Sequence, residues 1–167
     1  MDNRTKKMDK MMELIYEYPK KRSSIREIAR KTGLSKSTVH KKFIELEKEG
    51  ILDNKKLFSN TIYAKFAKTQ YYLKKIYKSG LVDFLIKTLS PSSIILFGSF
   101  AKGESASESD IDIFLEAKKK AIDFEKYEKK LNHKIQLFIE SDIKKLPDEL
   151  FNNVVNGIKL YGFFDAR

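Results

Sequence analysis

Apolar residues recur at three- and four-residue spacing through the first third of the chain, which predicts a series of amphipathic helices. The first stripe, at residues 8–15, ends before Pro19, because proline disfavours helix in the residue that precedes it. The second stripe follows residues 24–27, which fit a capping box, and it ends at Gly33, a residue suited to the left-handed position after a helix.

A third helix is predicted from the N-cap residue Ser35 to Gly50, with its apolar face turned to a core. Its outer face begins with short polar and cationic side chains of the kind that reach bases and phosphates in a DNA major groove. The residues of this candidate DNA-binding face are Lys36, Ser37, Thr38, His40 and Lys41.

The pattern after Gly50 predicts a small β-hairpin over residues 51–63, with Lys55 and Lys56 at its tip. Helix, helix, turn, outward-facing helix and basic hairpin in this order resemble the winged-helix family over roughly residues 5–63. The resemblance implies binding of double-stranded DNA, with the two hairpin lysines also in contact. A small helical bundle with a solvated lysine-rich face is the alternative explanation of the same periodicities.

Residues 64–89 form a mostly helical connector, interrupted at Ser79-Gly80, in the predicted organisation. Its aromatic side chains could stack on bases, but packing in a core or a dimer interface is the expected use. We therefore expect a DNA-binding domain at residues 1–63, this connector, and a second domain at residues 90–167, with a homodimer possible through the connector.

The second domain opens with the apolar run 94–97, as expected for a buried strand, and the run stops at Gly98 and Ser99. Residues 100–103 can begin a helical turn, so backbone N–H groups and a hydroxyl would meet at a strand-to-helix junction. Such a junction suits phosphate oxygens, and this makes Gly98 and Ser99 candidate nucleotide-binding residues.

Ten residues separate Ser99 from Asp110, where a second strand is predicted to begin. Side chains alternate along a strand, so Asp110 and Asp112 point the same way, and a carboxylate pair of this kind suits Mg²⁺. The alternative is a turn followed by a half-exposed strand whose acids are only solvated. The segment GSFAKGESASESDIDIFLE resembles the Gly-Ser, ten-residue gap, Asp-x-Asp signature of minimal nucleotidyltransferases in the DNA polymerase beta superfamily, over about residues 80–163.

That resemblance implies that Gly98 and Ser99 bind a nucleoside triphosphate (NTP), that Asp110 and Asp112 are catalytic residues holding Mg²⁺, and that a nucleoside monophosphate passes to an acceptor. Active relatives usually present a third carboxylate on a later strand. The position aligned with it here is Gln136, an amide that carries no charge and accepts no proton. Glu116 and Glu140 are placed too far along their strands to replace it.

Charge separates the two halves of the chain. Residues 1–80 hold 21 Lys and Arg against 9 Asp and Glu, whereas residues 81–167 hold 13 against 14, so the net charge of +11 belongs to the first half. The absence of cysteine excludes disulfides and thiolate metal sites. No apolar run reaches the roughly 20 residues of a membrane span, and we expect a cytoplasmic protein.

The sequence thus predicts an α+β protein: an N-terminal winged helix of three helices and a hairpin wing, followed by a small nucleotidyltransferase domain with a mixed sheet. Three functions stay open. The chain could transfer NMP to a protein or nucleic-acid acceptor, it could regulate transcription through an inactive, nucleotide-sensing transferase domain, or it could bind nucleic acid as a scaffold with no ligand in the second domain.

Overall fold

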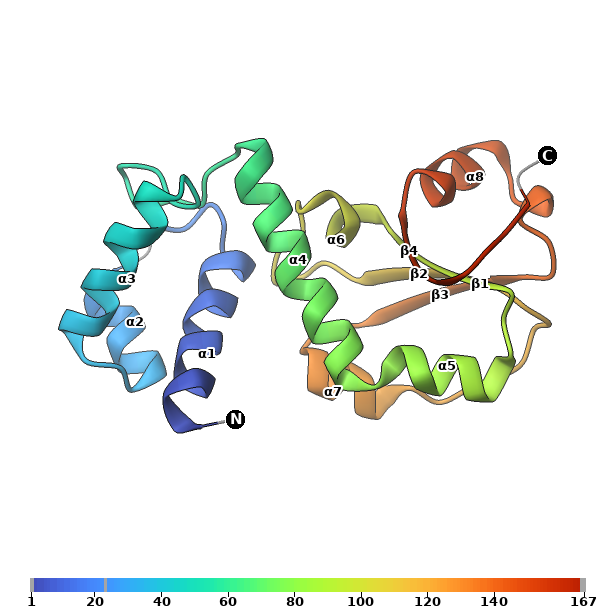
Figure 1. Ribbon diagram of the computed structural model, residues 1–167, viewed down its shortest axis with the longest axis horizontal. Helices are drawn as coiled ribbons and strands as arrows, with labels where there is room; N and C mark the ends of the chain where they lie inside the picture. Colours follow the sequence, from blue (N-terminus) through green and yellow to red (C-terminus); the bar gives the residue numbers. More distant parts are fainter. Residues whose placement is uncertain (1, 23, 166–167) are drawn as a thin grey trace. The chain divides into compact units, whose positions relative to one another are not determined.

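The computed structural model describes residues 2–22 and 24–165, and the chain divides into two compact units between Lys68 and Thr69 (Figure 1). The division falls inside helix α4 (Ile62–Ser79). The first unit is helical and the second contains the sheet, so the α+β class is confirmed. The division crosses the predicted connector: residues 64–68 belong to the first unit and residues 69–89 to the second.

The first unit contains three complete helices and the beginning of α4. The complete helices are α1 (Asn3–Glu17), α2 (Ile25–Thr32) and α3 (Lys36–Lys48). They end where the sequence predicted, and Gly33 adopts the left-handed conformation after α2 with φ 69°. The apolar stripes meet in one core, whose fully buried members include Met11, Ile15, Val39, Phe43 and Leu46.

The predicted capping box of α2 does not form. The Ser24 side chain makes no hydrogen bond to the helix N-terminus. Glu27 instead pairs with the ammonium groups of Lys21 and Lys31 at 2.8 and 2.9 Å. The Glu27 carboxylate is thus paired with two lysines, and the predicted reciprocal cap is absent.

The wing is smaller than the predicted hairpin. One antiparallel bridge joins Leu52 to Phe58, and the turn between them is closed by Asp53, whose carboxylate accepts the N–H groups of Lys55 and Leu57 at 2.9 Å each. The predicted last strand, residues 61–63, is wrong. The Thr61 hydroxyl accepts the N–H of Ala64 at 3.2 Å and thereby starts α4.

The second unit is built on a four-stranded mixed sheet in the order β3-β2-β1-β4. Its strands are β1 (Ser93–Phe97), β2 (Ile111–Glu116), β3 (Ile135–Glu140) and β4 (Ile158–Gly162). Strand β1 runs antiparallel to β2 and to β4, whereas β2 and β3 are parallel. The mixed sheet is therefore confirmed.

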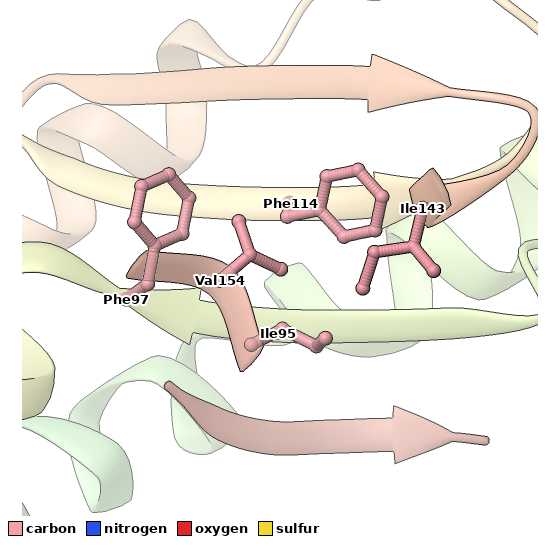
Figure 2. Close-up of a cluster of buried hydrophobic side chains, with 5 residues drawn as sticks. All are labelled: Ile95, Phe97, Phe114, Ile143 and Val154. Atoms are coloured by element: carbon pink, nitrogen blue, oxygen red, sulfur yellow. The ribbon is translucent and has the colours of Figure 1, made fainter. Parts of the chain in front are cut away.

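Helices cover both faces of this sheet (Figure 1). On one face lie α5 (Leu81–Leu89) and α7 (Glu125–Leu131), joined by a ring contact between Phe84 and Tyr127 with centroids 5.0 Å apart. On the other lie the short helix η1 (Ile143–Lys145) and α8 (Asp148–Val155). Figure 2 shows the core of that second face: Ile95, Phe97, Phe114, Ile143 and Val154.

Candidate functional site

The predicted phosphate turn lies where β1 ends and the five-residue helix α6 (Gly98–Lys102) begins. Gly98 has φ 68°, a conformation that favours glycine. A Cβ atom at this position would also collide with the Oδ2 atom of Asp112. The structure therefore brings together two of the predicted site residues, and it explains why the turn needs glycine: the backbone passes directly over a carboxylate.

The two aspartates differ in environment. Asp110 is exposed and lies one residue before β2, so the strand begins at Ile111 rather than at Asp110 as predicted. Asp112 is half-buried inside the strand. Burial raises the pKa of the Asp112 carboxyl, and the negative charge of Asp110 raises it further. A cation between the two groups would relieve both penalties.

Gln136 stands directly beside Asp112 in the register of the parallel pair β2–β3. Paired residues on neighbouring strands project to the same face of a sheet, so the Gln136 amide shares the face of the Asp112 carboxylate. Among residues 2–22 and 24–165, no group of three or more His, Cys, Asp or Glu side chains is placed to hold a metal ion. The site thus pairs two carboxylates with one amide.

Neither nearby glutamate on this face replaces the missing acid. The pair Phe114–Phe138 separates Asp112 and Gln136 from the next pair, Glu116–Glu140. The Glu116 carboxylate accepts the Ile143 N–H at 3.0 Å and the Ser92 hydroxyl at 2.6 Å. These bonds tie Glu116 to the chain segments around it.

Glu140 is similarly committed to local contacts. Its carboxylate pairs with the Lys119 ammonium at 3.2 Å and accepts the Ser141 N–H at 2.9 Å. These interactions lower the pKa of Glu140. Both glutamates therefore stabilise the far end of the strands, and the prediction that they cannot serve the site has a structural explanation.

The donor set that remains fits Mg²⁺. This ion is commonly held by one or two protein carboxylates, with phosphate oxygens of a substrate and water filling its other positions. Asp110 and Asp112 supply the carboxylates, and the pKa of Asp112 is raised by its burial and by the Asp110 charge, so a cation beside both groups would be favourable. Gln136 contributes at most one neutral oxygen.

One residue near the site escaped sequence reasoning. His133 is buried, and its Nδ1 atom lies 3.0 Å from the carbonyl oxygen of Ser109, the residue before Asp110. A cleft of about 360 Å³ beside it is also lined by Asp110. The sequence carries no signal for this contact, because the partner of His133 is a backbone atom more than twenty residues away.

The predicted DNA-binding residues lie at the start of α3. Ser35 caps the helix, accepting the N–H of Thr38 at 3.1 Å. Thr38 is half-buried, and the other predicted members of this face are exposed: Lys36, Ser37, His40 and Lys41. In the wing, Lys55 is exposed, whereas the Lys56 ammonium pairs with Glu47 at 2.8 Å.

Comparison with protein families gives two matches. Residues 10–53 match the family described as winged helix-turn-helix DNA-binding, and residues 80–162 match the family described as polymerase beta, nucleotidyltransferase. No curated protein and no solved structure matches the chain significantly. No helix in the described part of the chain is both long and apolar enough to span a membrane. The chain is therefore a winged helix-turn-helix DNA-binding domain fused to a nucleotidyltransferase domain of the polymerase beta family.

Proposed function

We propose that this protein is a DNA-binding transcription regulator whose C-terminal domain binds an NTP with Mg²⁺ and senses it, with little or no transfer chemistry. The observation that carries the proposal is the pairing of Gln136 with Asp112 across β2 and β3. The cytoplasmic location expected from the sequence belongs to this proposal, because a regulator works where its DNA is.

The residues at the glycine turn and the two aspartates support the proposal that the domain binds a nucleotide. The glycine turn lies against the Asp112 carboxylate, so phosphate oxygens at Gly98 and Ser99 would be within reach of an ion on the aspartates. Asp110 and Asp112 would hold Mg²⁺, which would neutralise the phosphate charge. These four residues therefore account for recognition of the triphosphate without any further catalytic group.

The chemical half of the site lacks a proton acceptor. In NMP transfer, an acceptor oxygen attacks the α-phosphorus, the bond to pyrophosphate breaks, and the acceptor hydroxyl loses its proton. A carboxylate beside the reacting oxygen can take that proton, whereas the amide of Gln136 cannot. Glu116 and Glu140 are engaged elsewhere, as described above. We infer that this domain binds a nucleotide but does not transfer NMP efficiently.

The basic first unit supplies the regulatory output in this proposal. Exposed Lys36 and Lys41 at the start of α3 suit contacts with DNA phosphates. A palindromic operator read by two copies would require a homodimer, which belongs to the same proposal.

The second candidate is a working transferase that modifies a protein or nucleic-acid acceptor. The close packing of Gly98 on Asp112 favours it, because the phosphate and metal positions keep the arrangement that transfer would use. An acceptor with its own general base, or an already ionised group, would make a base at position 136 unnecessary.

One experiment separates the candidates. The full chain is incubated with Mg²⁺ and each labelled NTP, with and without DNA, RNA and cell lysate, and bound nucleotide, pyrophosphate release and label transfer are measured. Affinity for DNA is then compared with and without the bound nucleotide. We expect nucleotide binding that changes DNA affinity, with no transfer. Transfer that vanishes in Asp110→Asn would instead establish the enzyme, and absence of nucleotide binding would overturn both.

A further inference from the structure

A buried histidine contacts the residue that precedes Asp110. His133 is 6% exposed and lies between the end of α7 and the start of β3. Its Nδ1 atom is 3.0 Å from the Ser109 carbonyl oxygen. A carbonyl oxygen only accepts hydrogen bonds, so Nδ1 carries the proton and donates it. The ring therefore has a defined orientation.

The segment that contains His133 holds the backbone on both sides of Asp110. The His133 ring binds the carbonyl of Ser109, and the carbonyl of the next residue, Lys134, accepts the N–H of Ile111 at 2.8 Å. Asp110 itself lies outside β2, where no strand ladder would fix it. These two hydrogen bonds hold the backbone around Asp110, together with a turn in which the Ser109 N–H donates to the Ala106 carbonyl at 3.0 Å.

The same ring also contacts the helix that carries the phosphate turn. Its centroid lies 4.9 Å from the ring of Phe100 in α6, edge to face at 81°. Phe100 is fully buried and follows Gly98 and Ser99 directly. Tyr72 closes the cluster, with its ring centroid 4.8 Å from Phe100 and 5.8 Å from His133. One side chain thus contacts the segment before Asp110 and the helix that begins with Gly98 and Ser99.

We propose that His133 is a positioning residue: its Nδ1–H fixes the backbone before Asp110, and its ring sets that backbone against the helix carrying Gly98 and Ser99. His133 does not touch a ligand in this role. The inference rests on the proposed function in one respect, since it assigns the purpose of the positioning to cation and nucleotide binding at Asp110.

Two variants separate the hydrogen bond from the ring. His133→Phe keeps an aromatic ring against Phe100 but removes the donor. His133→Asn removes the ring but places an amide N–H close to the original Nδ1 position. Three properties of the full-length protein are compared: hydrogen exchange of the backbone amides at residues 109–111 without metal, binding of Mn²⁺ as a paramagnetic probe, and the midpoint of thermal unfolding.

His133→Phe keeps the bond from the Ile111 N–H to the Lys134 carbonyl but frees the backbone just before it. We therefore expect exchange of the Ile111 amide to speed up by about fivefold, the factor that corresponds to one lost hydrogen bond in the segment, while exchange in β1 is unchanged. Mn²⁺ affinity should fall roughly tenfold, and His133→Asn should recover part of both losses. Unchanged exchange at residues 109–111 in both variants would overturn the proposal.

The same measurements test the role of His133 and the proposed nucleotide-binding function separately. If the wild-type protein binds no Mn²⁺ with or without NTP, the proposed function fails, and exchange at Ile111 still decides whether His133 positions the segment. If His133→Phe loses protection throughout the second unit, the ring cannot be replaced and His133→Asn becomes the deciding variant. If the amides of the second unit then exchange in His133→Asn as fast as in an unfolded chain, His133 serves general stability and the positioning role is overturned.

Discussion

Asp112 and Gln136 lie opposite each other on the parallel strands β2 and β3, with their side chains on one face of the sheet. The position at which the family resemblance predicts a third carboxylate therefore lies beside Asp112 and carries an amide. The neighbouring pairs along the strands, Phe114–Phe138 and Glu116–Glu140, leave no other acid free for the site.

Gln136→Glu should add the missing carboxylate with almost no change in side-chain size. We expect tighter Mn²⁺ binding and a rise in NMP transfer of roughly a hundredfold, the usual contribution of a positioned general base. The measurement is pyrophosphate release with each NTP. Gln136→Ala is the control, and a protein in which the alanine and glutamate variants transfer equally well would show that position 136 does not limit the chemistry.

Asp112→Asn should abolish metal-dependent nucleotide binding and yet stabilise the metal-free protein. The pKa of Asp112 is raised from 3.8, so its charge destabilises the folded state once the pH exceeds the raised folded pKa, and this penalty is absent below 3.8. We expect the variant to be more stable than the wild type at pH 7 and to show no gain below pH 3.8.

Urea unfolding at both pH values measures this gain. The control is Glu108→Gln, which removes an exposed carboxylate two residues before Asp110. Equal stabilisation by both variants would indicate a general charge effect rather than a local one.

Gly98→Ala should disrupt the site beyond its backbone cost. The left-handed conformation costs an alanine about 1–2 kcal/mol, and here the added Cβ also meets Asp112 Oδ2. Gly80→Ala is a matched control, since Gly80 has φ 82° with nothing within 4 Å of an added Cβ. We expect both variants to lose stability, Gly98→Ala more than Gly80→Ala because of the added contact, and only Gly98→Ala to lose nucleotide binding, measured by calorimetry. Retained binding would remove the turn from the site.

The double variant Lys36→Ala, Lys41→Ala should weaken DNA binding and flatten its salt dependence. Each lost phosphate contact reduces the slope of log affinity against log salt by about 0.9, so the slope should change by about two. Affinities at several salt concentrations give this slope. Lys118→Ala with Lys120→Ala removes equal charge from exposed positions of the second unit, and an equal slope change there would exclude a specific role for α3.

The free energy of unfolding of the first unit should rise with pH in mildly alkaline solution, because of Lys68. Its side chain is 1% exposed, and burial lowers its pKa from 10.5 to about 8. The unfolded chain binds more protons than the folded one between these values, so stability rises with pH across that window, by on the order of 1–3 kcal/mol.

Urea unfolding at pH 7.5 and 9.5 tests this dependence. Burial raises the pKa of Tyr16 from 10.0 to about 12, so Tyr16 lowers the stability of the folded state above pH 10. The upper value of pH 9.5 stays below that range. Lys68→Met should lose the rise, and a rise that persists in the variant would assign it to other groups.

Local patterns were sufficient for most elements. The helices of the first unit, β1 and the turn at Gly98 follow from periodicity, proline and glycine, because their determinants lie within a few residues of one another. The predictions failed where a non-local or competing interaction decided the outcome. Glu27 pairs with Lys21 and Lys31 in place of the predicted helix cap. The Thr61 hydroxyl starts a helix where the sequence pattern predicted a strand.

The sequence by itself determined the chemistry available to this protein: a basic N-terminal half, a Gly-Ser turn, two aspartates at fixed spacing, and no cysteine. Only the tertiary structure decided which of these groups meet. Strand register places Gln136 beside Asp112, a left-handed glycine packs on that carboxylate, and a histidine holds the backbone before Asp110. The physical reason is that register and burial depend on contacts between segments far apart in the chain, and no local pattern of residue types encodes them.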